Sequence, residues 1–305
     1  MLLALVCATL ALAATQQVDT TVNVVRGQRL DVKAYGGEVT VRGWNRNAVR
    51  IEASTSGRER VELTSSATAV SVRTEGRGGP PSDIALRISA PPWIALTVSG
   101  VNTSVKVDGV RAPISVETVE GEVDVIGGES LVSLRSVQGS VRLRGAKGRI
   151  SVNSVNDDVE VANSSGDVVA QTVNGEIALY TVDAASLDAS TVNGDISYSG
   201  PIRAGGRYAL STHNGDICLT IAEGTSASVA VSTFSGEFES EFPVPLRGTR
   251  KGKGFNFTLG SGSAQVTLES FQGTIQLVRP GSENDPARQR ERERHRDHDK
   301  DHDRD

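Results

Sequence analysis

The chain has 305 residues, of which 37% are hydrophobic and only 4% aromatic, and its formal net charge is -5. So few aromatic side chains exclude a wide, aromatic-rich core and favour a thin core of Val, Ile, Leu and Ala. The net negative charge argues against a nucleic-acid partner, because such proteins carry a basic footprint.

The first residues form an apolar run that ends in small residues, Ala11-Leu12-Ala13. This pattern predicts a signal peptide over residues 1–14, and hence a secreted, periplasmic or cell-surface protein. The run is shorter than the about 20 residues of a membrane span, so we expect no transmembrane helix in the mature chain. Two alternatives stay open: the true start lies upstream, since no basic residue precedes the run, or Cys7 carries a lipid. Removal of the peptide leaves Cys218 as the sole cysteine, which excludes an internal disulfide.

Residues 18–75 contain one clear alternating repeat, residues 30–41, among looser alternating strands. A Gly- and Pro-rich stretch at residues 76–81 predicts a loop after them. We therefore expect residues 18–75 to form an irregular β cap, because the open end of a strand stack exposes unpaired strand edges.

Residues 84–280 repeat one unit of about 18 residues, apolar-x-apolar-x-Ser/Thr-apolar-x-Gly-x-apolar-x-apolar. Its halves alternate with period two, which is typical of half-buried β-strands. An Asn-Gly pair such as Asn174-Gly175 often joins the halves, and both residues tolerate the positive φ of a turn. Copies of the unit, including the early one, begin at Leu30, Leu96, Ile114, Val132, Ile150, Val168, Leu187, Tyr208, Val229 and Val266.

Two architectures accommodate this unit. In a solenoid, each rung of about 18–21 residues makes two strands and two corners, and rungs stack about 4.8 Å apart. In an antiparallel meander, each Asn-Gly pair closes a type I′ hairpin. The constant period favours the solenoid, because a rung that meets only identical neighbours must itself repeat. The sequence therefore predicts an all-β, β-helix-like solenoid, with the meander as the alternative.

The stretch Asp83–Pro92, the stretch Leu96–Gly100 and the Thr-Val-Asn-Gly-Asp-Ile unit resemble a bacterial domain-of-unknown-function family. It comprises β-strand-repeat proteins that are labelled adhesins by analogy. The resemblance extends over roughly residues 20–280, because the repeat itself carries it. It implies a right-handed β-helical fold in the bacterial envelope or outside the cell. The family motif has no catalytic residues, and some relatives are associated with envelope-stress signalling.

Residues 281–305 are a low-complexity tail in which basic and acidic side chains balance from Pro286 onward. Such a segment cannot bury a core, so we expect it to be disordered. His295, His298 and His302 stand among aspartates and could bind Zn²⁺ or Ni²⁺ weakly. A solubilising charged tail is the simpler interpretation.

One polar column is the strongest candidate for a ligand site. Acidic residues recur one position past the corner glycine, at Asp158, Glu176, Asp195 and Asp216. Carboxylate oxygens are the ligands that Ca²⁺ prefers, so a stacked column of them could bind this ion. The spacing fits no established calcium loop, and solvated acids at a strand start are the simpler interpretation. No other cofactor is expected.

Three further features have both a functional and a simpler interpretation. A basic insertion could hold a phosphate or an anionic polymer, or be a solvated loop; its cations are Arg247, Arg250, Lys251 and Lys253. Cys218 occupies a mostly polar, outward column, where an exposed thiol could pair with a partner. His213 replaces the apolar residue at the corner, and no motif places a nucleophile near it, so a variable corner residue is the simpler interpretation.

Together these features predict a non-enzymatic secreted or cell-envelope protein, an adhesin-like scaffold that binds a protein or glycan of the envelope. An envelope-stress sensor or regulator is the alternative. A glycan-active β-helical enzyme ranks third, because such a site needs carboxylates with distinct partners and the acidic column is monotonous. The sequence does not indicate the oligomeric state.

Overall fold

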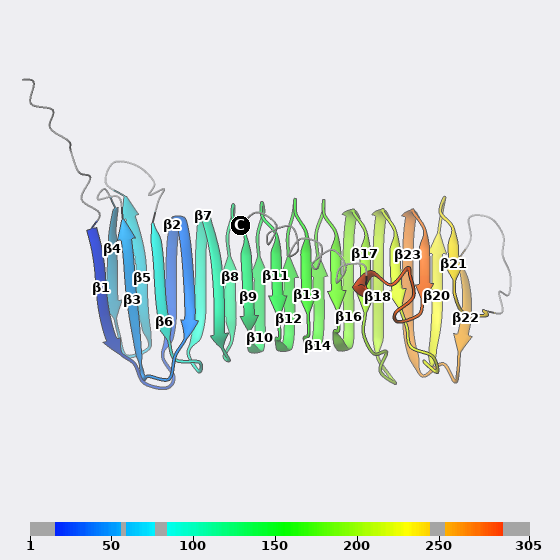
Figure 1. Ribbon diagram of the computed structural model, residues 1–305, viewed down its shortest axis with the longest axis horizontal. Coiled ribbons are helices and arrows are strands. Elements are labelled where there is room, and N and C mark those ends of the chain that lie inside the picture. Colours follow the sequence, from blue (N-terminus) through cyan, green and yellow to red (C-terminus); the bar gives the residue numbers. More distant parts are fainter. Residues whose placement is uncertain (1–15, 56–58, 77–83, 245–253, 289–305) are drawn as a thin grey trace, which may run out of the picture.

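The computed structural model describes residues 16–55, 59–76, 84–244 and 254–288, which form one long, flat stack of strands (Figure 1). Each central rung consists of two strands joined at a corner. First strands pair in parallel along one ladder and second strands along the other. The inward side chains of both ladders form one continuous hydrophobic core.

The strands fall into four groups. At the N-terminal end lie β1 (Gln16–Asn23), β2 (Arg29–Gly43), β3 (Ala48–Thr55), β4 (Glu59–Ser65), β5 (Ala69–Gly76) and β6 (Ala85–Ala90). The first ladder contains β7 (Ala95–Val110), β8 (Ile114–Glu117), β10 (Glu129–Arg135), β12 (Lys147–Asn153), β14 (Ser165–Gln171), β16 (Asp183–Asn193) and β18 (Arg207–Asn214). The second contains the later part of β7, β9 (Val123–Gly127), β11 (Val141–Arg144), β13 (Val159–Ala162), β15 (Ile177–Tyr180), β17 (Ile196–Ser199) and β19 (Ile217–Thr220). At the C-terminal end lie β20 (Ala227–Thr233), β21 (Phe238–Ser240), β22 (Phe255–Leu259), β23 (Ala264–Gln272) and β24 (Ile275–Val278).

The strand register confirms the predicted solenoid. Val132 pairs with Ile114 on one side and with Ile150 on the other, so each step is 18 residues. The step to Leu187 is one residue longer, because the pairing shifts between Gly166 and Asp167 and leaves an extra residue on the facing strand. The antiparallel meander is wrong, because every central pairing is parallel.

The core is thin and aliphatic, as the composition predicts. In one rung, Val132 and Leu134 of β10 and Val141 and Leu143 of β11 are fully buried. Full burial of such a side chain contributes roughly 1.5–3 kcal/mol. Their β-branched or aliphatic shapes suit the pleated surface of a strand.

The glycine corner explains the central part of the repeat unit. A Cβ on Gly194 would lie 2.0 Å from the carbonyl oxygen of Gly175, in the rung before. The φ of Gly194 is also positive, at 150°. Thr191, the Ser/Thr of the same unit, donates its buried hydroxyl to that carbonyl oxygen at 3.2 Å. The Gly175 oxygen thus accepts a hydrogen bond from Thr191, and it lies so close to position 194 that only glycine fits there.

The rungs at the N-terminal end do not follow chain order. Leu30 of β2 pairs in parallel with Leu96 of β7, so β2 is a rung of the stack. β5 and β6 form the next rung outward, on the far side of β2. β4 pairs antiparallel with β5, β3 with β6, and β1 with β3. The boundary between cap and stack therefore differs from the predicted one, because β2 and β5, predicted in the cap, belong to rungs that pair in parallel with the stack.

The C-terminal end shows a matching exchange. Val266 of β23 pairs with Tyr208 of β18 on one side and with Val229 of β20 on the other. The last rung of the chain, β23 and β24, therefore lies between two rungs that precede it in sequence. The long step before Val266 contains β22, which runs antiparallel to the outer strand β20.

The segment Gly281–Arg288 packs on the outer face of the stack, although the sequence predicts disorder from residue 281. Its Asp285 is only 5% exposed, accepts a hydrogen bond from the Thr220 hydroxyl at 3.2 Å and accepts another from the backbone amide of Gly281 at 2.7 Å. The disorder prediction is wrong for this segment, because one buried carboxylate fixes it.

Several sequence predictions concern residues outside the described ranges. They are the signal peptide with Cys7, the basic insertion residues Arg247, Arg250, Lys251 and Lys253, and the three tail histidines. Across the described ranges, no helix has the length and apolar character that a membrane crossing requires.

We predict that Gly194→Ala lowers the free energy of unfolding by about 3 kcal/mol, because the new methyl group collides with the Gly175 carbonyl oxygen. Gly145→Ala is the matched control, since Gly145 also has positive φ but nothing lies within 4 Å of its added Cβ. That variant should lose about 1 kcal/mol, the cost of left-handed backbone alone. Urea unfolding measures both, and equal losses would contradict the close-approach explanation.

Candidate functional site

A column of mostly apolar side chains follows the glycine corner along the stack; most are exposed, and Val137 and Val155 are half-buried. Seven of its members directly follow the buried Ser or Thr of their rung, whereas Tyr35 follows Ala34, Val101 follows Gly100 and Phe234 follows the half-buried Thr233. We call this column the corner stripe; in spatial order it comprises Tyr35, Val101, Val119, Val137, Val155, Val173, Val192, His213, Phe271 and Phe234. Val119 is 45% exposed and Phe234 is 66% exposed. Single exposed apolar residues are common, but a contiguous column of them marks an interaction surface.

The corner stripe ends in three stacked rings. His213 lies 4.6 Å from Phe271 between ring centroids, and Phe271 lies 4.8 Å from Phe234. The interplanar angles are 10° and 4°, so the rings stack face to face. The exchange of the last two rungs makes this stack, because β23 places Phe271 between the other two. His213 is thus one aromatic member of a structural column.

A ladder of asparagine amides runs beside the corner stripe. Asn174 donates its amide to the Asn156 side-chain oxygen at 3.1 Å, and Asn193 donates to Asn174 at 2.8 Å. Asn214 donates to Asn193 at 2.8 Å. Each inner amide both donates to one rung and accepts from the next, so the ladder stabilises the stack without a ligand.

The carboxylates of the acidic column, the predicted calcium site, accept hydrogen bonds from backbone amides of the next rung. Asp158 accepts the amide of Glu176 at 2.8 Å, and Asp195 accepts that of Asp216 at 2.8 Å. Asp216 in turn accepts the amide of Thr274 at 2.6 Å. Within the ranges that the structure describes, no three His, Cys, Asp or Glu side chains are grouped as metal ligands. Calcium binding stays a prediction without support from this geometry.

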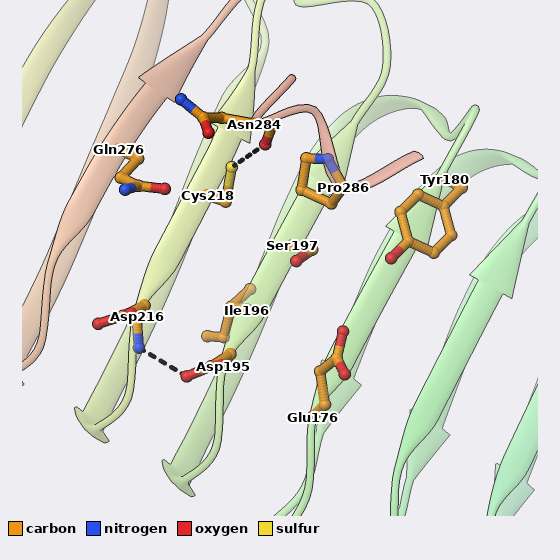
Figure 2. Close-up of a pocket in the computed structure, with 10 residues that line it drawn as sticks. All are labelled: Glu176, Tyr180, Asp195, Ile196, Ser197, Asp216, Cys218, Gln276, Asn284 and Pro286. Carbon is orange, nitrogen blue, oxygen red and sulfur yellow. Dashed lines mark hydrogen bonds between the residues drawn. The ribbon is translucent and has the colours of Figure 1, made fainter. Parts of the chain in front are cut away.

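A cavity of about 310 Å³ lies on the outer face of the second ladder, beneath the segment Gly281–Arg288. Figure 2 shows Pro286 of this segment between Cys218 and Tyr180, and Asp195 and Asp216 at the other end of the cavity. The Cys218 thiol lies 3.7 Å from the carbonyl oxygen of Asn284, to which it donates. Cys218 is therefore half-buried in its outward column, because the terminal segment covers its thiol.

The environment of Cys218 makes it a poor nucleophile. Burial raises the pKa of its thiol from 9.0 to about 12, and the carboxylates of Asp285, Glu241 and Asp216 contribute further. Because the thiolate is the reactive form, this thiol stays protonated and inert near neutral pH.

A second pocket, at the N-terminal end, contains both tryptophans of the chain, Trp44 and Trp93. The sequence pattern does not reveal it, because the two residues lie outside the repeat unit and far apart in sequence. The only feature of the sequence that points to these tryptophans is that each flanks a strand end next to a polar or Pro-rich turn.

Residues 131–278, from β10 to β24, match the model of the family described as Toastrack DUF4097. This part of the chain is similar to the Toastrack family. The match confirms the resemblance to a β-strand-repeat family and agrees with the parallel stack. None of the curated proteins matches the chain.

Three solved bacterial structures resemble the model. The first is a provisionally named cell adhesion protein of Clostridium sporogenes. It has 9% sequence identity and a TM-score of 0.24, and the alignment covers 87% of this chain and 100% of that chain. A provisionally named adhesin of Bacteroides fragilis has 9% identity and a TM-score of 0.38, with 87% and 99% covered. One of Parabacteroides merdae has 11% identity and a TM-score of 0.40, with 86% and 96% covered. Sequence identities and TM-scores this low give no information about the function of this chain.

We predict that Cys218 reacts with a thiol reagent at pH 8 roughly a thousandfold more slowly than a thiol of ordinary pKa, because its thiolate fraction is that much lower. The rate is measured with Ellman's reagent in a chain that carries Cys7→Ser. Asp285→Ala, which removes the carboxylate that fixes the covering segment, should raise the rate. An ordinary rate in the parent chain would contradict the burial of this thiol.

Proposed function

We propose that the chain is a non-enzymatic, adhesin-like binding scaffold of the cell envelope or cell surface, and that the corner stripe binds a protein partner. The continuous apolar column at the glycine corner is the observation that carries this proposal. A fully packed core fixes the column in place, so little side-chain or backbone order has to be gained on binding.

The surroundings of the corner stripe favour an apolar partner surface. The neighbouring asparagine amides already bond to one another, so a partner that covers them need not replace those hydrogen bonds. Val119 and Val173 are 45% and 40% exposed. Burying such side chains would contribute about 25 cal/mol per Å² of apolar surface.

A protein suits the stripe better than a glycan. Sugar rings pack on the flat faces of aromatic side chains, but Phe271 is stacked on both faces, by His213 and by Phe234. The remaining members are valines and one tyrosine, which offer a narrow apolar ridge. Such a ridge fits an apolar groove or a strand of a protein partner.

The polar side chains near this ridge have structural roles that support a non-enzymatic function. Asp195 and Asp216 hold backbone amides of the next rung, and Cys218 is protonated. A hydrolase or lyase would need such groups as free acids, bases or nucleophiles.

We predict that Val119→Ser combined with Val173→Ser weakens binding to isolated envelope proteins by about 2 kcal/mol, or roughly thirtyfold. Ile126→Ser with Leu131→Ser is the matched control, because these residues are 42% and 48% exposed but lie off the stripe. The control pair should bind like the parent chain in a solid-phase titration.

Protease treatment of the envelope fraction should abolish the binding, since the proposed partner is a protein. Two results would contradict the proposal: equal loss in both variant pairs, or binding that survives protease and disappears after glycan removal.

A further inference from the structure

A pocket of about 440 Å³ lies at the N-terminal end of the stack, where four connections meet. Arg26 comes from the β1–β2 connection, and Trp44 and Arg46 from the β2–β3 connection. Trp93 comes from the β6–β7 connection and Arg111 from the β7–β8 connection. These connections close the rungs on the edge opposite the glycine corner, so the pocket is separate from the corner stripe. Its volume lies within the about 300–1,000 Å³ of small-ligand sites.

Backbone contacts hold both tryptophans in place. The indole nitrogen of Trp44 donates to the Ala48 carbonyl oxygen at 2.7 Å, and its amide donates to the Ala90 carbonyl oxygen at 2.9 Å. Trp93 lies in a turn that Ile94 closes by donating its amide to the Pro91 carbonyl oxygen at 3.1 Å. Both rings are partly exposed, so they present apolar surface to the pocket at little ordering cost.

Arginines stand over both rings. The Arg46 guanidinium lies 5.2 Å from the ring centroid of Trp44, and that of Arg26 lies 5.7 Å from the ring centroid of Trp93. Arg111 is placed beside them by its backbone amide, which donates to the Pro92 carbonyl oxygen at 2.7 Å. Such cation–π contacts keep the guanidinium groups near the rings while their remaining N–H groups stay available.

The charge of the pocket is uncompensated. No acidic residue lines it, and none of its three arginines forms an ion pair with a carboxylate of the described residues. Three such cations stand out in a chain of net charge -5. Their shared field attracts an anion, and a guanidinium binds a carboxylate or sulfate through two parallel hydrogen bonds.

We propose that this pocket binds an acidic saccharide, whose ring packs on Trp44 or Trp93 and whose carboxylate or sulfate pairs with the arginines. A sugar ring offers a flat C–H face for the indoles, and its hydroxyls match the polar side chains of Asn45 and Asn47 in the wall. A neutral sugar would leave the three guanidinium groups without partners. This binding does not depend on the corner stripe or its partner.

Tryptophan fluorescence reports on this pocket alone, because Trp44 and Trp93 are the only tryptophans of the chain. Titration of the full chain with trigalacturonic acid should change the fluorescence with saturation, and added NaCl should weaken the binding. Maltotriose, a neutral trisaccharide, should give at least tenfold weaker binding.

Two variants and a control complete the test. Arg26→Gln with Arg111→Gln should weaken trigalacturonic acid binding at least tenfold and leave the fold of the chain unchanged. Arg149→Gln, an exposed arginine far from the pocket, should bind like the parent chain. Trp93→Ala should also lose binding.

Three outcomes would overturn the proposal: no saturable response, equal binding of maltotriose, or binding of ADP in place of the saccharide. The Val119→Ser, Val173→Ser pair should bind trigalacturonic acid normally, which separates this site from the corner stripe.

Discussion

The contact between a corner glycine and the carbonyl oxygen of the preceding rung sets the geometry of the whole stack. A Cβ on Gly215 would lie 2.0 Å from the Gly194 oxygen, and the Thr212 hydroxyl donates to that same oxygen at 2.9 Å. Each rung must therefore follow the last in one register, since a one-residue slip would place a side chain against this oxygen and turn the apolar residues outward. Thr103 and Asp157 stand at this corner position in place of glycine, and the Asp157 carboxylate accepts the Gly139 amide at 2.8 Å.

The columns of the surface follow from this register. Once the corners align, the residue after the Ser or Thr of a central rung becomes part of the corner stripe. At the next position, Asn156, Asn174, Asn193 and Asn214 form the asparagine ladder. The acids beyond the glycine then face the amides of the following rung, where Asp195 and Asp216 accept hydrogen bonds. The side chains of the asparagine ladder and of the acidic column thus already hold neighbouring rungs together. The corner stripe and the arginine–tryptophan pocket are the surfaces that a partner could use.

The repeat and its columns could be predicted from sequence, because period and alternation are local properties of the chain. The repeat predicts Leu30, Leu96 and Ile114 as equivalent starts, and Leu96 pairs with Leu30 on one side and with Ile114 on the other. The order of the terminal rungs could not be predicted, because every rung presents the same inward pattern and any two can be neighbours. The ordered segment at Asp285 was missed for another reason: one buried carboxylate fixes it, and composition indicates only solubility. Trp44 and Trp93 meet through β6 and the exchanged N-terminal rungs, which no repeat pattern encodes.

The order of the rungs at the C-terminal end is the most direct test, because it builds the aromatic end of the corner stripe. Ser211 and Ser232 each pair with Glu269, on opposite sides of β23. In a chain that carries Cys7→Ser and Cys218→Ser, the pairs Ser211→Cys with Glu269→Cys and Ser232→Cys with Glu269→Cys should form disulfides on mild oxidation. Ser211→Cys with Ser232→Cys should stay reduced, because two strand spacings, about 9.6 Å, exceed the reach of a disulfide. A disulfide in that last pair, with Ser211→Cys and Glu269→Cys remaining reduced, would show rungs in chain order and contradict the account.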